Sequence, residues 1–155
     1  MIDLVGELNL IVATLEEAGL DYALCGGLAL AIHGFPRATR DIDFIINPDD
    51  LPAIRQAIKR IGFTIDGGIL ILKKGTEHEF QLWRISRSAG PDLSTIDFIL
   101  VRSWLLEIWE RRQQFVVSDR TLTVVNVDGL RKMKIISARP QDLADLDRLN
   151  NPRTQ

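Results

Sequence analysis

A chain of 155 residues, 46% of them hydrophobic and 26% charged, is long enough to bury a core, and we expect one domain over residues 1–155. A lone cysteine excludes an internal disulfide, and the sequence holds neither an apolar run that could span a membrane nor the basic start of a signal peptide. The expected compartment is the cytoplasm, with no membrane partner. The net charge of −2 also argues against a long nucleic-acid groove.

The first third of the chain is predicted to alternate helices and strands. Apolar residues at helical spacing indicate an amphipathic helix over residues 3–18. A short strand over residues 21–25 leads into Gly26-Gly27 and a small-residue helix over residues 28–32. Residues 41–46 are predicted as a strand, and a second amphipathic helix begins at Asn47-Pro48 and ends at Gly62.

From residue 63 the apolar pattern changes to a period of two. It predicts strands over residues 63–65, 69–72, 80–85 and 94–101, with turns at 66–68 and 73–76. A helix over residues 103–112, a hairpin over 115–125 and two C-terminal helices, the second beginning at Pro140, complete the chain. This order of elements predicts an α/β (α+β) fold without internal repeats.

Asp41-Ile42-Asp43 places two carboxylates on one side of a strand, because side chains alternate, and about 7 Å apart. Magnesium is usually held by one or two protein carboxylates together with water and substrate phosphates. Upstream, Gly26-Gly27 at a helix start would let a phosphate approach backbone N–H groups, since no Cβ intervenes. The two motifs together predict a site for a metal-bound nucleoside triphosphate.

These residues resemble the signature of the DNA polymerase β-like nucleotidyltransferase superfamily, and more narrowly its AbiEii-type branch. The resemblance rests on Gly26-Gly27, the small-residue helix, Gly34 and Arg37-x-Thr39-Arg40-Asp41-Ile42-Asp43, and it extends over about residues 20–150. It implies a nucleotidyltransferase fold, in which a mixed, mostly antiparallel sheet is flanked by helices and followed by a C-terminal helical hairpin. A metal and triphosphate core over residues 1–101 would precede a helical and hairpin part over residues 102–155. The wider superfamily has Gly-Ser where this chain has Gly26-Gly27, so a serine hydroxyl is missing and phosphate contacts fall to backbone N–H groups.

The superfamily also implies a third carboxylate on a neighbouring strand. Asp97 is the candidate because it is the only charge in the apolar run 94–101. The alternative is that Asp97 caps a turn or lies at the exposed end of the strand, but a lone charge inside such a run is costly without a partner. The resemblance therefore implies two Mg²⁺ ions, or Mn²⁺ in their place, held by Asp41, Asp43 and Asp97.

A second segment of resemblance runs from Leu130 to Leu146. In AbiEii-type proteins a helix bearing a lysine is followed by an arginine and by a helix that carries an aspartate. The match falls on Lys134 and Asp142, with Asp145 one turn further on. It implies that Lys134 contacts the triphosphate or the leaving pyrophosphate and that Asp142 orients Lys134 or the acceptor. An ordinary helical hairpin with solvated charges is the alternative.

Arg37, Thr39 and Arg40 lie in the loop before Asp41, where a guanidinium could grip phosphate. The alternative is a salt bridge that pins this loop to Asp41 or Asp97, and both interpretations stay open. Residues 1–52 carry two basic and nine acidic side chains, whereas residues 102–139 carry eight basic and four acidic ones. A fold that brings the basic segment over the acidic site would form a bipolar cleft suited to metal and polyphosphate.

We therefore expect a metal-dependent nucleotidyltransferase that moves a nucleotide monophosphate from a nucleoside triphosphate such as ATP to an acceptor hydroxyl. The predicted catalytic residues are Asp41, Asp43, Asp97, Lys134 and Asp142, and the predicted nucleotide-binding residues are Gly26, Gly27, Arg37, Thr39, Arg40 and Lys134. Transfer RNA, a protein or a small molecule could supply the hydroxyl, and the branch implies a toxin with a cognate antitoxin. Two other functions stay open: an inactive module of the same fold that binds a partner, and a nucleotide-sugar glycosyltransferase, whose fold normally needs a longer chain.

Overall fold

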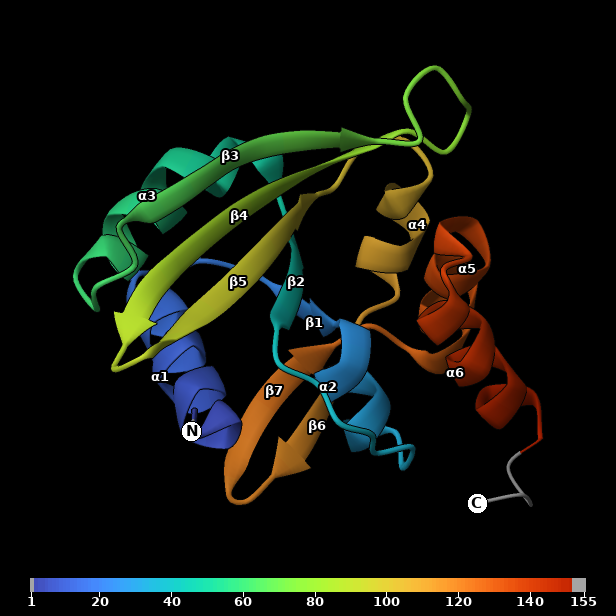
Figure 1. Cartoon of the computed structure of the whole chain (residues 1–155), viewed down its shortest axis with the longest axis horizontal. Coiled ribbons are helices and arrows are strands. Elements are labelled where there is room, and N and C mark those ends of the chain that lie inside the picture. Colours follow the sequence, from blue (N-terminus) through green and yellow to red (C-terminus); the bar gives the residue numbers. More distant parts are fainter. Residues whose placement is uncertain (1, 152–155) are drawn as a thin grey trace.

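The computed structural model describes residues 2–151, so Met1 and residues 152–155 of the expected domain lie outside the described residues. Its centre is a seven-stranded sheet in the order β3-β4-β5-β2-β1-β7-β6 (Figure 1). The strands are β1 Ala23–Cys25, β2 Ile42–Ile46, β3 Ile65–Leu72, β4 Phe80–Ala89, β5 Asp92–Leu100, β6 Gln113–Val117 and β7 Arg120–Val124. The β2–β5 and β1–β7 pairs are parallel and the other neighbouring pairs are antiparallel, so the expected mixed, mostly antiparallel sheet is confirmed.

The helices lie on both sides of the sheet. They are α1 Leu4–Glu17, α2 Gly26–Ile32, α3 Leu51–Lys59, α4 Leu105–Glu110, α5 Val127–Ser137 and α6 Pro140–Asn150, and a short 3₁₀ turn, η1 Pro48–Asp50, precedes α3. Figure 1 shows α1 and α3 behind the β3-β4-β5 part of the sheet, with α4, α5 and α6 on the right of the view. Ala138, in the left-handed conformation (φ 50°), turns the chain between α5 and α6, which form the expected C-terminal helical hairpin. No helix within residues 2–151 has both the length and the apolar character needed to cross a membrane.

The main core lies between the sheet and the helices α1 and α3. Ile11 and Leu15 of α1 and Ile58 of α3 are fully buried, as their helical spacing predicts. On the sheet, Trp83 and Phe98 stack with ring centroids 5.5 Å apart on neighbouring strands. Phe98 also stacks on Phe44 of β2, with ring centroids 5.7 Å apart, so the aromatic layer connects β4, β5 and β2. The side chains on the opposite face of these strands form the site described below.

The predicted turn at residues 66–68 is wrong. Residues 65–72 form a single strand, β3, whose pairing with β4 is irregular between Asp66 and Ile69. The carboxylate of Asp66 accepts hydrogen bonds from the backbone N–H of Gly68 (2.8 Å) and from the indole of Trp83 (2.8 Å). The two glycines therefore sit in a bulge of one long strand rather than between two strands. The helix predicted over residues 103–112 is also shorter than expected, because it begins at Leu105 and ends at Glu110.

Candidate active site

Two of the three predicted carboxylates lie side by side on the sheet. β2 and β5 are parallel neighbours, and Asp43 is in register with Asp97. In-register residues on neighbouring strands share a face and have backbones about 4.8 Å apart. Both side chains line one cavity, and Asp97 is only 5% exposed, which excludes the alternative of a turn cap at an exposed strand end. Asp41 lies one residue before β2, exposed and outside the lining of that cavity.

The charge of Asp43 is poorly compensated by the protein. Burial, followed by the negative charges of Asp97 and Asp41, raises the pKa of Asp43 from 3.8 to about 7, against the opposing effect of Arg139 and Lys134. Within residues 2–151, Asp43 forms no hydrogen bond or ion pair. A half-buried carboxylate with two acidic neighbours is an unfavourable arrangement unless a cation joins it.

Asp97, in contrast, has a strong partner that we did not predict. Nε and Nη2 of Arg84 donate to its two carboxylate oxygens at 2.8 and 2.9 Å. The hydrogen bonds and charge of Asp97 raise the pKa of Arg84 above its ordinary value, so the guanidinium of Arg84 stays charged. Arg84 stands next to Asp97 because β4 pairs antiparallel with β5 in that register, which no local sequence pattern reveals. Each oxygen keeps a further lone pair with which it could bind a metal.

The glycine pair is required by the side chains that lie against it. Gly26 has a positive φ of 69°, and a Cβ at this position would collide with the carboxylate of Asp43. A Cβ on Gly27 would lie 2.8 Å from Oγ1 of Thr39 and 3.2 Å from Nη1 of Arg37. The start of α2, which no side chain caps, therefore meets the 37–39 loop and the β2 carboxylate at one place. The sequence predicted that the glycine pair and Asp43 belong to one site, whereas the contact of Gly27 with Thr39 and Arg37 is seen only in the structure.

Lys134 is held by a residue to which we gave no role. Its Nζ donates to Oδ2 of Asp145 at 2.8 Å and lies 3.8 Å from Oδ1 of Asp142. Arg37 Nε donates to the other oxygen of Asp145 at 2.9 Å. Of the two interpretations left open for this loop, Arg37 forms a salt bridge, but with Asp145 of α6 and not with Asp41 or Asp97. Asp145 is 1% exposed and Lys134 5%, so this buried network fixes the lysine and the loop together.

Asp142 stabilises the start of α6. Its carboxylate accepts from the backbone N–H of Arg139 (3.1 Å) and from Nε of the same arginine (2.8 Å). Burial works to raise the pKa of Asp142, but hydrogen bonds from Arg139 and Ser137 outweigh it and lower the pKa below the ordinary value. Arg139, another residue without a predicted role, lines the cavity and acts electrostatically on Asp43 and Asp97.

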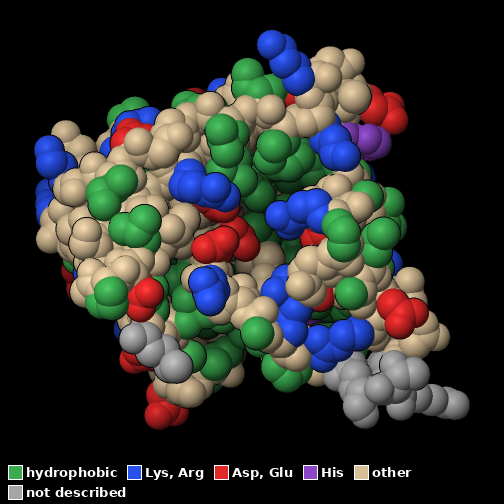
Figure 2. Space-filling view, in the orientation of Figure 1, with side chains coloured by type: hydrophobic (Ala, Val, Ile, Leu, Met, Phe, Trp, Pro, Cys, Tyr) green, Lys and Arg blue, Asp and Glu red, His purple; other side chains and the backbone are tan. Residues whose placement is uncertain are grey.

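The cavity that joins these residues has a volume of about 420 Å³. Figure 2 shows a hollow near the centre of this face, where acidic and basic side chains meet below a group of hydrophobic ones. Its charged lining includes Asp43, Asp97 and Asp142 from the acids and Arg84, Lys134 and Arg139 from the bases. The basic segment of the chain therefore lies over the acidic site, as its charge distribution suggests. Arg40 is exposed, and none of its contacts within residues 2–151 is an ion pair.

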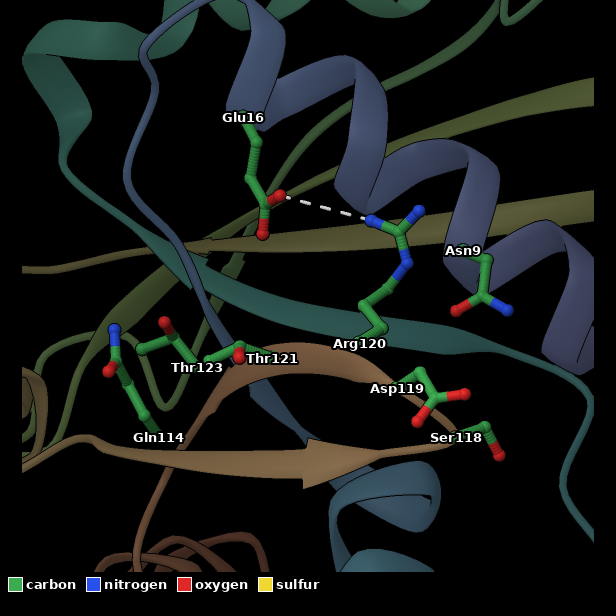
Figure 3. Close-up of a pocket in the computed structure, with 8 residues that line it drawn as sticks. All are labelled: Asn9, Glu16, Gln114, Ser118, Asp119, Arg120, Thr121 and Thr123. Atoms are coloured by element: carbon green, nitrogen blue, oxygen red, sulfur yellow. Dashed lines mark ion pairs between the residues drawn. The ribbon is translucent and has the colours of Figure 1, made fainter.

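A wider hollow of about 640 Å³ lies elsewhere, between α1 and the β6–β7 hairpin (Figure 3). Glu16 and Arg120 form an ion pair across it, with 3.8 Å between Oε2 and Nη1. Its lining is polar, and no predicted site residue takes part. We place the candidate active site in the smaller cavity, because that cavity holds the perturbed carboxylate and the convergent charges.

The donor set suits a hard divalent cation. Asp43 and Asp97 offer carboxylate oxygens on adjacent strands, and in the part of the chain that the structure describes Asp43 has no hydrogen bond or ion pair. Within residues 2–151, no three His, Cys, Asp or Glu side chains converge closely enough to enclose a metal on their own. Magnesium commonly takes only one or two protein carboxylates, with water and substrate phosphate as its other ligands. The residues therefore fit Mg²⁺ or Mn²⁺ bound together with a triphosphate.

Solved structures share this architecture. The lincosamide antibiotic adenylyltransferase LnuA, solved with lincomycin bound, superposes with a TM-score of 0.59 at 15% identity over 94% of this chain and 96% of its own. ANT(2")-Ia, solved with adenylyl-2"-tobramycin, gives a TM-score of 0.60 at 12% identity over 99% of this chain and 91% of its own. A Thermotoga maritima protein assigned to the nucleotidyltransferases gives a TM-score of 0.66 at 13% identity over 98% of this chain and 96% of its own. The fold is that of the nucleotidyltransferases.

The sequence itself places the chain more narrowly. Residues 10–153 match the family model described as "Nucleotidyl transferase AbiEii toxin, Type IV TA system". The chain belongs to this family and is a nucleotidyltransferase. No curated protein sequence matches it.

Proposed function

We propose that the protein transfers a nucleotide monophosphate from a nucleoside triphosphate, ATP among the candidates, to an acceptor hydroxyl with the help of divalent metal ions. The observation that carries this proposal is the pair Asp43 and Asp97, in register on adjacent strands and facing a cavity whose other wall is basic. Mg²⁺ or Mn²⁺ would be held by this pair, with Asp41 joining from the loop. Bound there, the ions would polarise the α-phosphate and make the acceptor oxygen more nucleophilic.

The chain's own residues would grip the triphosphate from the opposite side of the metal pair. Gly26 and Gly27 leave room for phosphate oxygens near the uncapped start of α2. Lys134 would offset the charge that builds on the departing pyrophosphate, in a position set by Asp145. Arg139 reaches the same cavity from the start of α6, where Asp142 orients it.

The loop before β2 would complete the phosphate site. Thr39 lies over Gly27, and Arg37 is tied to α6 through Asp145. Arg40 is exposed and free to turn toward an entering polyphosphate. A guanidinium matches phosphate geometry and remains charged at any ordinary pH, so these side chains suit the role.

The proposed reaction is a single displacement. The acceptor oxygen forms a bond to the α-phosphorus while the bond from that phosphorus to the bridging oxygen breaks and pyrophosphate leaves. The hydroxyl proton passes to the carboxylate pair. In-line geometry puts the attacking and leaving oxygens on opposite sides of the phosphorus, so pyrophosphate would leave at the Gly26 and Lys134 end and the acceptor would enter beside Asp97.

The direct test is label transfer. The protein would be incubated with Mg²⁺, each α-labelled nucleotide in turn, and total RNA, protein extract or small-molecule extract as the acceptor. We expect wild type to label one class and Asp43→Asn to lose at least about 100-fold of the rate, as removal of one group that stabilises a transition state does. Asp119→Asn, in the exposed β6–β7 turn, is the matched control and should retain the wild-type rate.

Equal labelling by wild type and Asp43→Asn would refute the assignment of the site. Titration with Mg²⁺ and nucleotide adds an independent measure, since binding should release heat and raise the melting temperature. No heat and no thermal shift would favour an inactive partner-binding module.

The family description supports a further part of the proposal, that the protein is the toxin of a toxin–antitoxin pair in the cytoplasm, with a cognate antitoxin as partner. Induced expression of wild type should then slow growth, whereas Asp43→Asn at the same level should not. Equal growth of both strains would contradict the toxin role without touching the transferase assignment.

A further inference from the structure

The active-site cavity has a second, apolar end that the triphosphate site does not use. Leu70, Leu72, Phe80, Leu82, Trp104 and Met133 line it, and we call this set the apolar arm. The side chains of Leu70 and Leu72, which line the cavity from strand β3, are 42% and 37% exposed. Large apolar side chains left open to water in a cavity beside a reactive centre mark a ligand surface.

The sheet register fixes where the apolar arm begins. Arg84 stands opposite Asp97, and two residues along the same pair of strands Leu82 stands opposite Ile99. Leu82 in turn pairs with Leu70 on β3. The inner face of the sheet therefore changes from charged to apolar immediately beyond Asp97, on the side away from Gly26.

The opposite wall is built by α4 and α5. Trp104, at the start of α4, contacts Phe80 edge to face with ring centroids 5.8 Å apart, and its indole donates to the carbonyl oxygen of Glu79 at 3.3 Å. Met133 comes from α5, one residue before Lys134. These contacts hold the aromatic rings in place, so the apolar arm is a formed surface beside the reactive groups.

The charges of the cavity are almost all at its other end. Of the charged side chains that line the cavity among residues 2–151, Lys73 follows Leu72 of the apolar arm directly and Lys134 follows Met133. A nucleic acid is gripped through several phosphate contacts and a polycation through several carboxylates. The apolar arm offers neither, and it matches a compact group with an apolar ring or chain.

We propose that the apolar arm is the acceptor subsite, and that the acceptor is a small, largely uncharged molecule whose hydroxyl lies next to an apolar ring or chain. This inference rests on the proposed function, because the in-line geometry of transfer places the acceptor on the Asp97 side of the α-phosphorus. The apolar body of the acceptor packs on Leu70, Leu72 and Met133. Its hydroxyl then points back toward Asp97 and Asp43.

The test uses 2-(2-naphthyl)ethanol as a neutral probe and methyl NMR of the full chain as the readout. The probe is added in the presence of Mg²⁺ and α,β-methylene-ATP, which cannot be turned over at the α-phosphate. We expect shifts at the methyl groups of Leu70, Leu72 and Met133, while those of Ile69 and Ile71 stay unchanged. Ile69 and Ile71 are the matched control, since they alternate with the two leucines on the same strand and are 46% and 47% exposed.

Variants on the two faces of β3 make the comparison quantitative. The double change Leu70→Ser with Leu72→Ser should weaken probe binding about tenfold or more, and Ile69→Ser with Ile71→Ser should leave it within about twofold. Equal weakening by both pairs would overturn the proposal, as would a probe that shifts no methyl group of the apolar arm.

Two other occupants give distinct results. If α,β-methylene-ATP alone shifts the methyl groups of the apolar arm and the probe cannot then bind, the arm holds the base of the nucleotide and the proposal is wrong. If an RNA oligonucleotide shifts these groups and displaces the probe, the acceptor class is wrong. If the nucleotide analogue binds nowhere, the proposed function fails and the acceptor assignment fails with it. If the analogue binds and the probe shifts no methyl group of the apolar arm, only this inference fails.

Discussion

Asp43→Asn is expected to stabilise the metal-free protein above about pH 7 while it abolishes transfer. In the folded state, burial and the charges of Asp97 and Asp41 raise the pKa of Asp43 from 3.8 to about 7. A change of this size corresponds to about 4 kcal/mol of unfavourable free energy for the ionised form. Because Asp43 is partly open to water, we expect about half of that, roughly 2 kcal/mol, to appear as instability.

The sign of the pH dependence follows from proton binding. Between about pH 4 and pH 7 the folded state holds a proton on Asp43 that the unfolded chain has lost. The free energy of unfolding of wild type therefore falls as the pH rises through this range and levels off above it. Asparagine carries no charge at any pH, so the variant should lack this fall.

The measurement is urea-induced unfolding of both proteins with a chelator present, at about pH 5 and about pH 8. The variant should gain about 2 kcal/mol over wild type at the higher pH and little at the lower one. Asp119→Asn controls for the loss of an exposed carboxylate and should shift neither value. Saturating Mg²⁺ should stabilise wild type and leave Asp43→Asn unchanged, because the ion binds the ionised pair.

The reasoning would be refuted by a variant that is equally or less stable than wild type at about pH 8 in the absence of metal. Such a result would mean that Asp43 has a compensating partner and that no cation is needed beside it.

Three other changes probe the surroundings of Asp43. Gly26→Ala should lower the free energy of unfolding in urea by about 2 kcal/mol or more, because the φ of 69° and the nearby Asp43 carboxylate both exclude a Cβ. Adding Asp43→Ala should recover part of this loss, and strictly additive effects would contradict the contact between Gly26 and Asp43. Lys134→Met should abolish transfer and lower the free energy of unfolding by about 3 kcal/mol, the latter because Asp145 loses a buried partner. An unchanged unfolding midpoint would show that this ion pair does not stabilise the fold. Hydrogen bonds outweigh burial and lower the pKa values of Asp142 and Asp145, so the stability that these groups give is present above about pH 4 and is lost as the pH falls further. Circular dichroism during acid titration should therefore show a shallower loss of folded structure for Asp142→Asn than for wild type. Identical curves would show that Asp142 does not contribute to the acid sensitivity.

Much of the candidate site follows from local patterns. Strand alternation predicts that Asp41 and Asp43 share one side, although only Asp43 lies in β2 and lines the cavity. The run of β-formers around Asp97 predicts its strand, and Pro140 indicates the start of the second C-terminal helix. The family resemblance supplied the links to Lys134 and Asp142. These predictions needed only neighbouring residues or a known motif, so the single chain was enough.

The partners of these residues could not be predicted in the same way. Arg84 meets Asp97 through the register of β4 on β5, and Asp145 meets Arg37 across 108 positions of sequence. The turn predicted at residues 66–68 was wrong for a similar reason. Asp66 accepts a hydrogen bond from the indole of Trp83 on β4, which holds the two glycines within strand β3. Side-chain contacts between distant segments depend on register and burial, which periodicity does not encode.

The amino-acid sequence by itself determined the family, the strands that carry Asp43 and Asp97, the glycine pair next to Asp43 and the opposite net charges of the acidic first third and the basic segment 102–139. Tertiary structure alone decided that Asp43 keeps an uncompensated charge while Asp97 is paired, that Lys134 is held by Asp145, and that the inner face of the sheet turns apolar beyond Asp97. The physical reason is that the neighbours and register of a strand depend on hydrogen bonding and burial across the whole sheet, which a local sequence pattern does not contain. The charge or the apolar surface that faces a given residue is therefore fixed only when the whole sheet has formed.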